Sequence, residues 1–562
     1  MVIFKSLQPD IDLPRDLTVW DWAFDSPYSP LNRFPESELR GYQNAITKER
    51  INWKDVKECT TYLSTALVKR YGLKEGETVA LFSRNTIWYP VAMLGTLRAG
   101  GKVSGASPAY NVEEMTYALK TADAKFLMTA PTSMDIAVAA AKNAGIPKEN
   151  VFLLEDQLEG YTTIKELIEM GKSYGASGQI PAFKLPPGKK NKDVCGFLSF
   201  SSGTTGLPKA VMISHQNVIA QCLQVQQITP TSHNKILAVL PLFHITGLVH
   251  GLHLPILINA EVIMLPAFTM ESMLSTIVEY QLGELLLVPP ILIRLVRDPI
   301  VDKYDLRHLT RFSSGAAPLS EEIIQLLKKK FPGTGFKQGY GMTESCSCIT
   351  AHPPDKYDYK YAHSVGSIVA STEVKIIRED GKEAGVGEPG EILARGPQIV
   401  MGYLNNEKAT KETFDADGFL HTGDQGMIDE EGMVYILDRI KEMIKVKGIG
   451  VAPAELEDLL LGHDMVEDVA VLGMKDDYAG ELPKAFVVLK AGVPESEKTA
   501  KELLAFVREK KTKYKWIKEI EFIKEIPKSA SGKILRRLLR DKKSGADKVV
   551  VVRDAVGEKA ML

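Results

Sequence analysis

A run of nine residues gathers hydroxyl groups, backbone amides and one ammonium into a single loop: Ser201, Ser202, Gly203, Thr204, Thr205, Gly206, Leu207, Pro208 and Lys209. Groups of this kind together suit a nucleotide phosphate. The apolar runs 195–200 and 210–213 on either side predict two buried strands that the loop joins. A Walker P-loop is excluded, because Pro208 precedes Lys209 and Ala210 follows it where that loop has Ser or Thr. A surface loop without a ligand is the alternative, which nine specified positions ending in lysine disfavour.

The composition excludes several classes of protein. The chain has 562 residues, enough for several structural units, and its 69 Lys and Arg balance 71 Asp and Glu, so no nucleic-acid or anionic-membrane partner is indicated. The five cysteines are too scattered for a disulfide framework or a zinc site, which favours a reducing compartment. The N-terminus lacks a secretory signal pattern, and His and Pro interrupt the apolar region 236–265, so no integral membrane span is expected.

The C-terminal tripeptide bears on location. Ala560, Met561 and Leu562 are loosely similar to the peroxisomal address, although Met561 replaces its basic residue. We therefore expect a peroxisomal location, or otherwise a cytoplasmic one.

Most of the first 430 residues predict layered α/β structure. Residues 78–82 read as a strand, 86–98 as a helix and 99–103 as a turn into a second strand, which together form a βαβ unit. Such units give parallel sheets. Further apolar strands are expected at 124–129, 236–240 and 283–288.

A smaller α/β unit is expected after Asp438. Helices at 453–461 and 499–511 and strands near 466–472 and 485–489 compose it. We therefore divide the chain into an N-terminal domain 1–438, a C-terminal domain 439–545 and a tail 546–562, with a hinge in the polar junction 438–441.

Four further segments complete a recognisable set: Ser314 to Leu319 (SGAAPL), Gln338 to Glu344 (QGYGMTE), His421 to Asp424 (HTGD) and Pro527 to Lys533 (PKSASGK). With the phosphate loop, in this order and spacing, they resemble the adenylate-forming superfamily, most closely its branch of 4-coumarate:CoA ligases and firefly luciferases. The resemblance spans nearly the whole chain. It implies a large N-terminal α/β region with a small mobile C-terminal domain. It also implies that ATP converts a carboxylate to an acyl-adenylate, after which the thiol of coenzyme A displaces AMP.

The resemblance assigns nucleotide-binding roles residue by residue. Thr204, Thr205 and Lys209 would contact the β- and γ-phosphates, and Thr343 the α-phosphate, while Glu344 would hold Mg²⁺. Asp424 would accept hydrogen bonds from the ribose hydroxyls with support from Arg439. The remaining residues of the nucleotide set are Ser201, Ser202, Gly203, Gly315, Ala316, Ala317, Gln338, Gly339 and Tyr340.

Two residues are expected to act on the reacting carboxylate. Lys533 would stabilise the charge that develops during adenylation. A solvated basic stretch is the alternative reading, but the Ser-x-Ser-Gly-Lys context selects Lys533 over Lys528 and Arg536. His244 lies in an apolar run, where a buried structural histidine is common. The surrounding segment PLFHITG matches the family's histidine beside the substrate carboxylate.

In the family the small domain rotates between the two half-reactions. By resemblance Lys441 matches the hinge, and Lys445, Lys447 and Gly448 match positions that face the second site or the coenzyme A tunnel. The sequence departs from the close relatives at Gly450, where they have glutamine, and at Ala267, where plant coumarate ligases have a CoA-binding lysine. These departures concern CoA contacts and not adenylation.

The acyl pocket is expected to involve Thr246, His250, Ser313, Gly339, Ser345, Cys346, Ser347 and Cys348. These differ from the tyrosine and the Gly-Pro-Val run of coumarate ligases. A free aryl acid, of the phenylpropanoid or phenylacetate type, or a medium-chain fatty acid is therefore the expected substrate of a monomeric or homodimeric acid:CoA ligase. A luciferase-like adenylating monooxygenase and a catalytically silent acyl-binding scaffold are the alternatives, and the presence of Lys209, Glu344, Asp424 and Lys533 argues against the scaffold.

Overall fold

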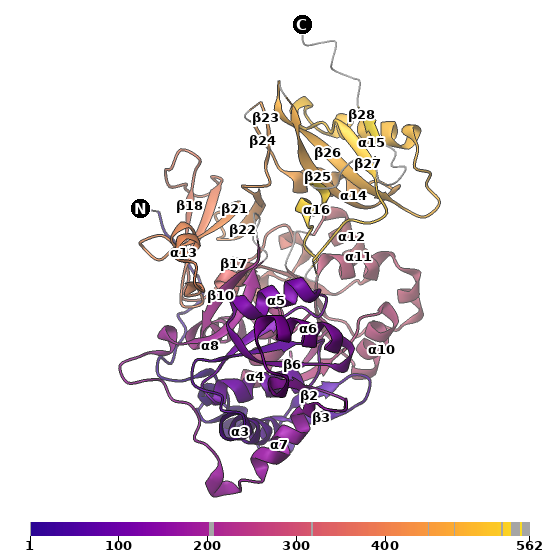
Figure 1. The fold of residues 1–562 in the computed structure, drawn as a ribbon. Coiled ribbons are helices and arrows are strands. Elements are labelled where there is room, and N and C mark those ends of the chain that lie inside the picture. Colours follow the sequence, from indigo (N-terminus) through magenta and orange to yellow (C-terminus); the bar gives the residue numbers. More distant parts are fainter. Residues whose placement is uncertain are drawn as a thin grey trace.

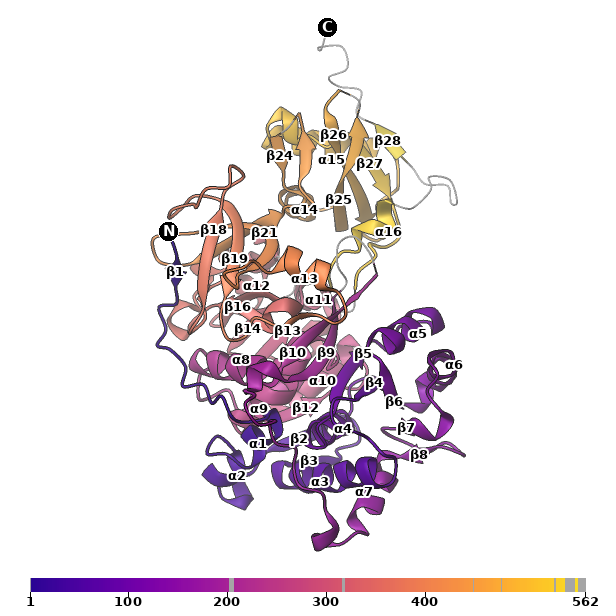
Figure 2. The same ribbon diagram turned by 60° about the vertical axis from the view of Figure 1, so that its left-hand side comes forward.

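The computed structural model shows a large N-terminal unit and a smaller C-terminal unit that sits at one end of it (Figures 1 and 2). Both units mix helices and strands, as the sequence predicts. None of the helices in the described part of the chain is long and apolar enough to span a membrane. All five cysteines are free. The structure describes residues 2–201, 207–315, 319–447, 449–476, 478–529, 532–540 and 551–553.

The central sheet of the N-terminal unit is parallel except at one edge. Across it the strands run β20 (Gly402–Tyr403), β10 (Lys209–Ser214), β9 (Cys195–Ser201), β5 (Lys102–Ala106), β4 (Thr78–Phe82), β6 (Ala124–Thr129), β7 (Val151–Leu153) and β8 (Thr162–Thr163). From β9 to β8 all neighbours are parallel, whereas β10 pairs antiparallel with both β9 and β20. Helix α4 (Trp88–Arg98) connects β4 to β5, and every residue in it is buried. The predicted βαβ unit is confirmed.

Two further sheets flank this one. The first contains β11 (Lys235–Ala238), β12 (Glu261–Met264), β2 (Gly41–Asn44) and β3 (Arg50–Asn52). The second runs β13 (Glu284–Leu287), β14 (Arg311–Ser314), β15 (Gly335–Met342), β16 (Ser347–Ala351) and β17 (Ser367–Ile368). Strands β13, β14 and β15 are parallel, and their apolar face packs into a core with α10 (Met270–Tyr280), α11 (Pro289–Arg297) and α12 (Glu321–Lys330).

An antiparallel sheet forms where layered α/β structure was expected. It contains β1 (Phe4–Lys5), β18 (Glu373–Ile377), β19 (Gly390–Arg395), β21 (Leu420–Ile428) and β22 (Val434–Arg439). The α/β layering predicted for most of the first 430 residues does not extend to this sheet. The reason is visible in β21, where burial alternates at every residue along the strand. One face is packed and the other solvated, which antiparallel hairpins permit and helix-covered parallel sheets do not.

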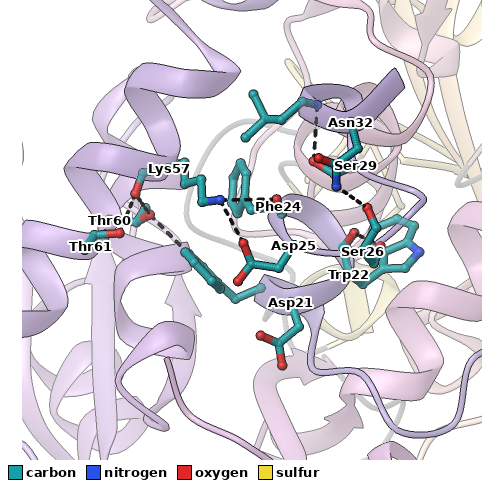
Figure 3. A network of polar contacts seen from close by, with 12 residues as sticks. Asp21, Trp22, Phe24, Asp25, Ser26, Ser29, Asn32, Lys57, Thr60 and Thr61 are labelled. Atoms are coloured by element: carbon teal, nitrogen blue, oxygen red, sulfur yellow. Dashed lines mark hydrogen bonds and ion pairs between the residues drawn. The ribbon is translucent and has the colours of Figure 1, made fainter. Parts of the chain in front are cut away.

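Several helices cover the sheets of the N-terminal unit. They include α3 (Trp53–Lys69), α5 (Val112–Thr121), α6 (Met134–Ala144), α7 (Ile164–Lys172), α8 (His215–Gln227), α9 (Leu254–Leu257) and α13 (Glu407–Thr413). The short helices α1 (Val19–Phe24) and α2 (Pro30–Arg33) dock against α3 (Figure 3). Lys57 of α3 holds them by an ion pair of its Nζ with Asp25 Oδ1 at 2.8 Å. Ser26, just after α1, donates its hydroxyl to the Trp22 carbonyl at 2.6 Å.

The C-terminal unit is one sheet with helices packed on it. Its strands run β24 (Ile449–Val451), β23 (Ile444–Val446), β26 (Gly480–Leu489), β27 (Glu519–Phe522) and β28 (Val551–Arg553), with β25 (Val466–Asp476) also paired to β26. Helices α14 (Pro453–Leu461), α15 (Glu497–Lys510) and α16 (Arg536–Arg540) complete it. Helix α14 has the predicted bounds. Helix α16 begins at Arg536, because Ile534 still pairs with Lys528 in an extended bridge.

The two units are joined by hydrogen bonds between side chains of one unit and backbone groups of the other. Arg297 of α11 donates through Nη2 to the Leu461 carbonyl at the end of α14, at 3.2 Å. The Glu321 amide at the start of α12 donates to Asp458 Oδ1 at 3.1 Å. These contacts set how α14 sits on the larger unit.

A buried ion cluster anchors α16 within the smaller unit. Arg536 donates through Nη1 to Glu442 Oε2 at 2.8 Å and through Nη2 to Glu457, and all three side chains are only 11% exposed. Burial raises the pKa of Glu457, which Arg536 opposes. One guanidinium is therefore shared by two largely buried carboxylates.

Replacing this guanidinium tests the anchor. We expect Arg536→Met to lower the free energy of unfolding of the C-terminal unit by about 3–5 kcal/mol at pH 8, because breaking a buried ion pair leaves uncompensated charge. The loss should be smaller at pH 5, since Glu457, whose pKa burial raises, is then closer to its neutral form. Denaturant unfolding measures both values. Arg537→Met, at an exposed position of the same helix, is the matched control; an equal effect of the two substitutions would contradict the assignment.

Candidate active site

Strands β9 and β10 place both ends of the predicted phosphate loop side by side. Ser201, the last residue of β9, lies opposite Lys209, the first residue of β10. The strands predicted on either side of the loop are thus confirmed. The other loop residues predicted to bind nucleotide, Ser202, Gly203, Thr204 and Thr205, lie outside the described residues.

Tyr403 connects Lys209 to Glu344. The Lys209 ammonium lies 4.7 Å from the centre of the Tyr403 ring, and the Tyr403 hydroxyl donates to Glu344 Oε1 at 2.9 Å. Glu344 is 3% exposed. A cation for phosphate and a carboxylate for a metal therefore flank one aromatic ring. Tyr403 was not among the predicted site residues; a tyrosine on a short strand after Gly402 was the only available signal.

Asp424 holds a buried carboxylate at the end of the antiparallel sheet. It accepts the Tyr340 hydroxyl at 2.7 Å on Oδ2, and Arg439 Nε lies 3.3 Å from Oδ1. Burial raises the pKa of Asp424, against the effects of Arg439 and Tyr340. These three predicted residues are brought together, although they come from β15, β21 and β22. A short carboxylate oriented in this way still has acceptor positions for the hydroxyls of a sugar.

Lys533 belongs to the same group even though it comes from the other unit. Burial, followed by the charge of Arg439, lowers the pKa of Lys533 to about 8. The charges of Glu442, Asp424 and Glu344 oppose this shift. The ammonium therefore lies within electrostatic reach of Asp424, the carboxylate predicted to bind the ribose, and of Glu344, the carboxylate predicted to bind the metal. The C-terminal unit is thus oriented with Lys533 toward the predicted nucleotide residues.

A tight turn delivers Lys533 to this place. The Ser529 amide donates to the Lys533 carbonyl at 2.8 Å, and the Lys533 amide donates to the Ser529 hydroxyl at 3.2 Å. Between them Gly532 has φ of +82°, and a Cβ there would lie 3.0 Å from Pro290 Cδ at the start of α11. Glycine is therefore required both by the left-handed backbone and by the close approach of the two units.

The residues predicted around the adenine are only partly brought together. A Cβ on Gly315 would lie 3.8 Å from the Gly339 carbonyl, so these two residues are neighbours across the ends of β14 and β15. Ala316 and Ala317 lie outside the described residues. Gln338 is 6% exposed, and its side chain donates to the Ala362 carbonyl. Its amide nitrogen is therefore already hydrogen-bonded inside the protein. Thr343 is half-buried and lies in the turn directly before Glu344.

His244 lines a narrow cleft in the N-terminal unit, together with Leu240, Pro241, Thr246, Leu286, Leu287, Val288 and Gly315. Burial lowers the pKa of His244 to about 4, so its ring is neutral at physiological pH. Its Nδ1 accepts from the Thr246 amide at 3.4 Å, which leaves Nε2 as the protonated nitrogen and a hydrogen-bond donor. A neutral donor of this kind can bind a carboxylate without adding charge. A larger hollow of about 440 Å³ lies near α2 and α3 and contains none of the predicted site residues.

Beyond Thr246 the chain forms the π-helical segment η6 (Gly247–His253), on which His250 lies. Its Nε2 is 3.1 Å from the Ser347 hydroxyl and 3.9 Å from Cys348 Sγ. Burial lowers the pKa of His250 to about 3. Ser313 of β14 is also buried and donates its hydroxyl to Glu284 Oε1 at 3.1 Å. Among the predicted pocket residues, His250 is therefore an uncharged polar side chain in contact with Ser347.

Two of the predicted pocket residues are placed elsewhere. Cys346 is fully buried within the main apolar core, where burial raises the pKa of its thiol, so its predicted place in the pocket is corrected. Ser345 is also fully buried, and its hydroxyl donates to the Ser347 carbonyl at 2.8 Å. Left-handed backbone at Cys346, with φ of +49°, turns the chain so that Ser347 and Cys348 and not Cys346 approach His250.

The predicted coenzyme A residues lie apart from this group. Lys441, Lys445 and Lys447 are exposed on and beside β23. Lys445 Nζ pairs with Glu379 at 3.2 Å, and Lys447 lies over the Tyr478 ring at 4.3 Å. Gly448 lies outside the described residues. In this orientation the C-terminal unit presents Lys533, and not these lysines, to the nucleotide residues.

Family models and known proteins agree with this geometry. Residues 36–404 match the AMP-binding enzyme model, and residues 455–533 match the model of the AMP-binding enzyme C-terminal domain. The chain is 35% identical over 548 residues to 4-coumarate-CoA ligase-like 1 of Arabidopsis thaliana, covering 96% of this chain and 97% of the relative. It is 37% identical over 490 residues to the probable 4-coumarate-CoA ligase 1 of Dictyostelium discoideum, covering 84% and 87%.

Solved structures show the same two-unit arrangement. The anthranilate CoA ligase AuaEII, solved with anthranoyl-AMP, aligns with a TM-score of 0.81 at 25% identity, covering 94% of this chain and 98% of that one. MatB from Rhodopseudomonas palustris, solved with ATP, aligns with a TM-score of 0.80 at 26% identity, covering 93% and 98%. The chain therefore belongs to the AMP-binding enzymes, and within the adenylate-forming superfamily it is an acyl-CoA ligase of the 4-coumarate:CoA ligase-like branch.

Proposed function

We propose that this enzyme is an AMP-forming carboxylic acid:CoA ligase that acts on a free aryl or medium-chain aliphatic acid. The observation that carries the proposal is the convergence of Lys533 on Asp424, Arg439 and Glu344 across two units of the chain. A cation held at this point can stabilise the negative charge that develops as a carboxylate attacks a phosphate.

In the first half-reaction a carboxylate oxygen of the acid attacks the α-phosphorus of ATP and displaces pyrophosphate. Asp424 binds the ribose hydroxyls, and Lys209 and Lys533 neutralise phosphate charge, so the reacting atoms are held in line. His244 donates a hydrogen bond from Nε2 to the acid. The narrow apolar walls beside it, Leu240, Leu286 and Val288, exclude water from the acyl-adenylate.

The residues present fit a magnesium ion. The described residues contain no cluster of three or more His, Cys, Asp or Glu side chains that could enclose a metal. Mg²⁺ with a nucleotide needs only one or two carboxylates, because phosphate oxygens and water complete its coordination. Glu344, buried and already oriented by Tyr403, would hold it. The ion would neutralise charge on the phosphates during their displacement.

In the second half-reaction the thiolate of coenzyme A attacks the acyl carbon and expels AMP. The exposed lysines at 441, 445 and 447 are candidates to approach coenzyme A after the C-terminal unit turns about the junction that follows β22. That β22 ends at Arg439 and the next strand, β23, joins a different sheet supports a pivot there. The domain boundary at residues 438–439 remains a prediction.

A panel of acids tests the proposed reaction. With aryl, cinnamic and short to long aliphatic acids, we expect acid-dependent release of AMP that requires both ATP and coenzyme A. In Lys533→Ala the acid-dependent exchange of pyrophosphate into ATP should fall by about 10²- to 10³-fold, because one stabilising contact in the transition state is lost. Lys528→Ala, a neighbouring lysine paired with Asp468, is the control. Full exchange in Lys533→Ala would refute its role, and pyrophosphate release without thioester would point to another acceptor.

The pH profile provides a second test of Lys533. The cationic form is present below the pKa of about 8 and is lost as the pH rises through it. We therefore expect kcat/KM for adenylation, which reports the free enzyme, to fall on the alkaline side near pH 8. Lys533→Arg should remove this limb even if its rate is lower, since a guanidinium stays protonated. An alkaline limb unchanged in Lys533→Arg would assign it to another group.

The proposed location is the peroxisome, or otherwise the cytoplasm, and the basis is the tripeptide Ala560, Met561 and Leu562, which lies outside the described residues. A fluorescent protein that ends in the last residues of this chain should accumulate in peroxisomes. The same fusion without the tripeptide should not. A diffuse signal from both fusions would remove the peroxisomal proposal.

A further inference from the structure

One face of the parallel strands β13, β14 and β15 is polar although it lies inside the protein. The strand register places Leu286, Ser313 and Lys337 side by side, and it places Glu284 beside Arg311 two residues earlier. Side chains alternate along a strand, so these residues share the face opposite the apolar core. The face continues at the carboxyl end of the strands into Gly315 and Gly339, beside the cleft that His244 lines.

His250 of η6 lies across from this face. Burial is the main cause of the lowered pKa of His250, and the charge of Lys337 adds to it. Burial raises the pKa of the Cys348 thiol, and the charge of Lys337 opposes that rise, so its ammonium is near both. Lys337, His250 and Cys348 each keep part of their surface accessible, although burial is the main cause of the lowered pKa of the lysine and the histidine. These groups are surrounded by protein and yet keep accessible surface, and we call the region between them the recess.

The carboxylate in this region is already matched. Glu284 forms an ion pair with Arg311, accepts the Ser313 hydroxyl at 3.1 Å and lies 3.2 Å from His233 Nδ1. These neighbours, with Lys337, hold the pKa of Glu284 at about 2 despite its burial. Burial lowers the pKa of His233, and the charge of Glu284 opposes this shift. The carboxylate of Glu284 is therefore paired directly with Arg311 and His233, and Lys337 acts on it only through space.

Lys337 has no equivalent partner. Within the described part of the chain no hydrogen bond or ion pair joins its Nζ to another residue, and the nearest ring, that of Tyr357, is 5.9 Å away. Counting Glu284 as −1 and Arg311 and Lys337 as +1 each leaves a net charge of +1 on this interior face. An unmatched cation away from bulk water is costly, because buried charges are normally paired with opposite ones.

We propose that this recess binds a second carboxylate, at the distal end of the substrate acid, with Lys337 as its ionic partner. His250 and the Ser347 hydroxyl supply hydrogen bonds to the same group. Lys337 precedes Gly339 by two residues, roughly 6.6 Å along β15, so one acid can extend from His244 to this ammonium. The substrate class is then a dicarboxylic acid, either an aliphatic diacid or an aryl acid with a distal carboxylate. This inference rests on the proposed acid:CoA ligase activity.

The comparison of each diacid with its monomethyl ester tests the inference in the unmodified enzyme. The two compounds have nearly the same length and one free carboxylate to activate, but only the diacid keeps a distal anion. Across straight-chain diacids of increasing length and carboxy-substituted aryl acids, we expect kcat/KM for the best diacid to exceed that of its ester about tenfold or more, as a charge-assisted contact requires. Esters or unsubstituted acids that are used as well as every diacid would overturn the inference.

Substitution then assigns the preference to Lys337. In Lys337→Met the ratio of kcat/KM for diacid over ester should fall by about tenfold or more, mainly through KM of the diacid. Lys337→Arg should restore much of the ratio because it restores the cation. Lys329→Met, on the exposed side of α12, is the matched control and should leave the ratio unchanged. A ratio unaffected by Lys337→Met would assign the preference elsewhere and refute the role of this lysine.

The outcomes separate this inference from the proposed function. If the enzyme forms thioesters from monocarboxylic acids but discriminates against diacids, the ligase activity stands and the inference fails. If no acid of either class supports release of AMP, the proposed function fails first. The diacid and ester comparison needs no variant, so misfolding of Lys337→Met would not prevent a decision.

Discussion

Charges placed inside this protein have to be matched, and the chain matches them across neighbouring strands in exact register. Glu284 lies opposite Arg311 on β14, Asp424 opposite Arg439 on β22, and Lys484 of β26 opposite Glu519 on β27. Each pair is within ion-pair distance. A slip of one residue would move one partner of each pair to the other face of its sheet, so these contacts select the register as well as stabilise it. Lys337 of β15 has no such partner, because its neighbour on β14 is Ser313.

The nucleotide residues depend on the same rule at the junction of the two units. Arg439 ends the last strand of the antiparallel sheet and pairs with Asp424, while Glu442, three residues later, already belongs to the ion cluster of Arg536. The chain thus passes from one charge-matched group to another within a few residues. Lys533, on the turn before α16, follows the second group closely in the fold and lies within electrostatic reach of Asp424 and Arg439 in the first.

Much of the fold could be predicted from the sequence, because apolar periodicity is a local property. Strand β4 and helix α14 have the predicted bounds, and the strands around the phosphate loop differ from prediction by a residue at each affected end. The antiparallel sheet from β18 to β22 was not predicted, because its strands pair across segments that are distant in the sequence. The candidate nucleotide residues were predicted from short segments in a fixed order. Tyr403, Glu284 and Lys337 could not be predicted in this way, because the roles of their side chains depend on contacts between distant strands and not on their neighbours in sequence.

The lowered pKa of Lys533 has a consequence for the binding of ATP. In the structure its ammonium has lost water and stands beside Arg439, and the carboxylates nearby only partly compensate. A triphosphate brings several negative charges to this ammonium, which favours its protonated form. Binding of ATP near pH 8 is therefore coupled to uptake of a fraction of a proton from the solution. The enthalpy of binding would then vary with the ionisation enthalpy of the buffer, so that a calorimeter would register the arrival of the nucleotide partly as heat from the buffer itself.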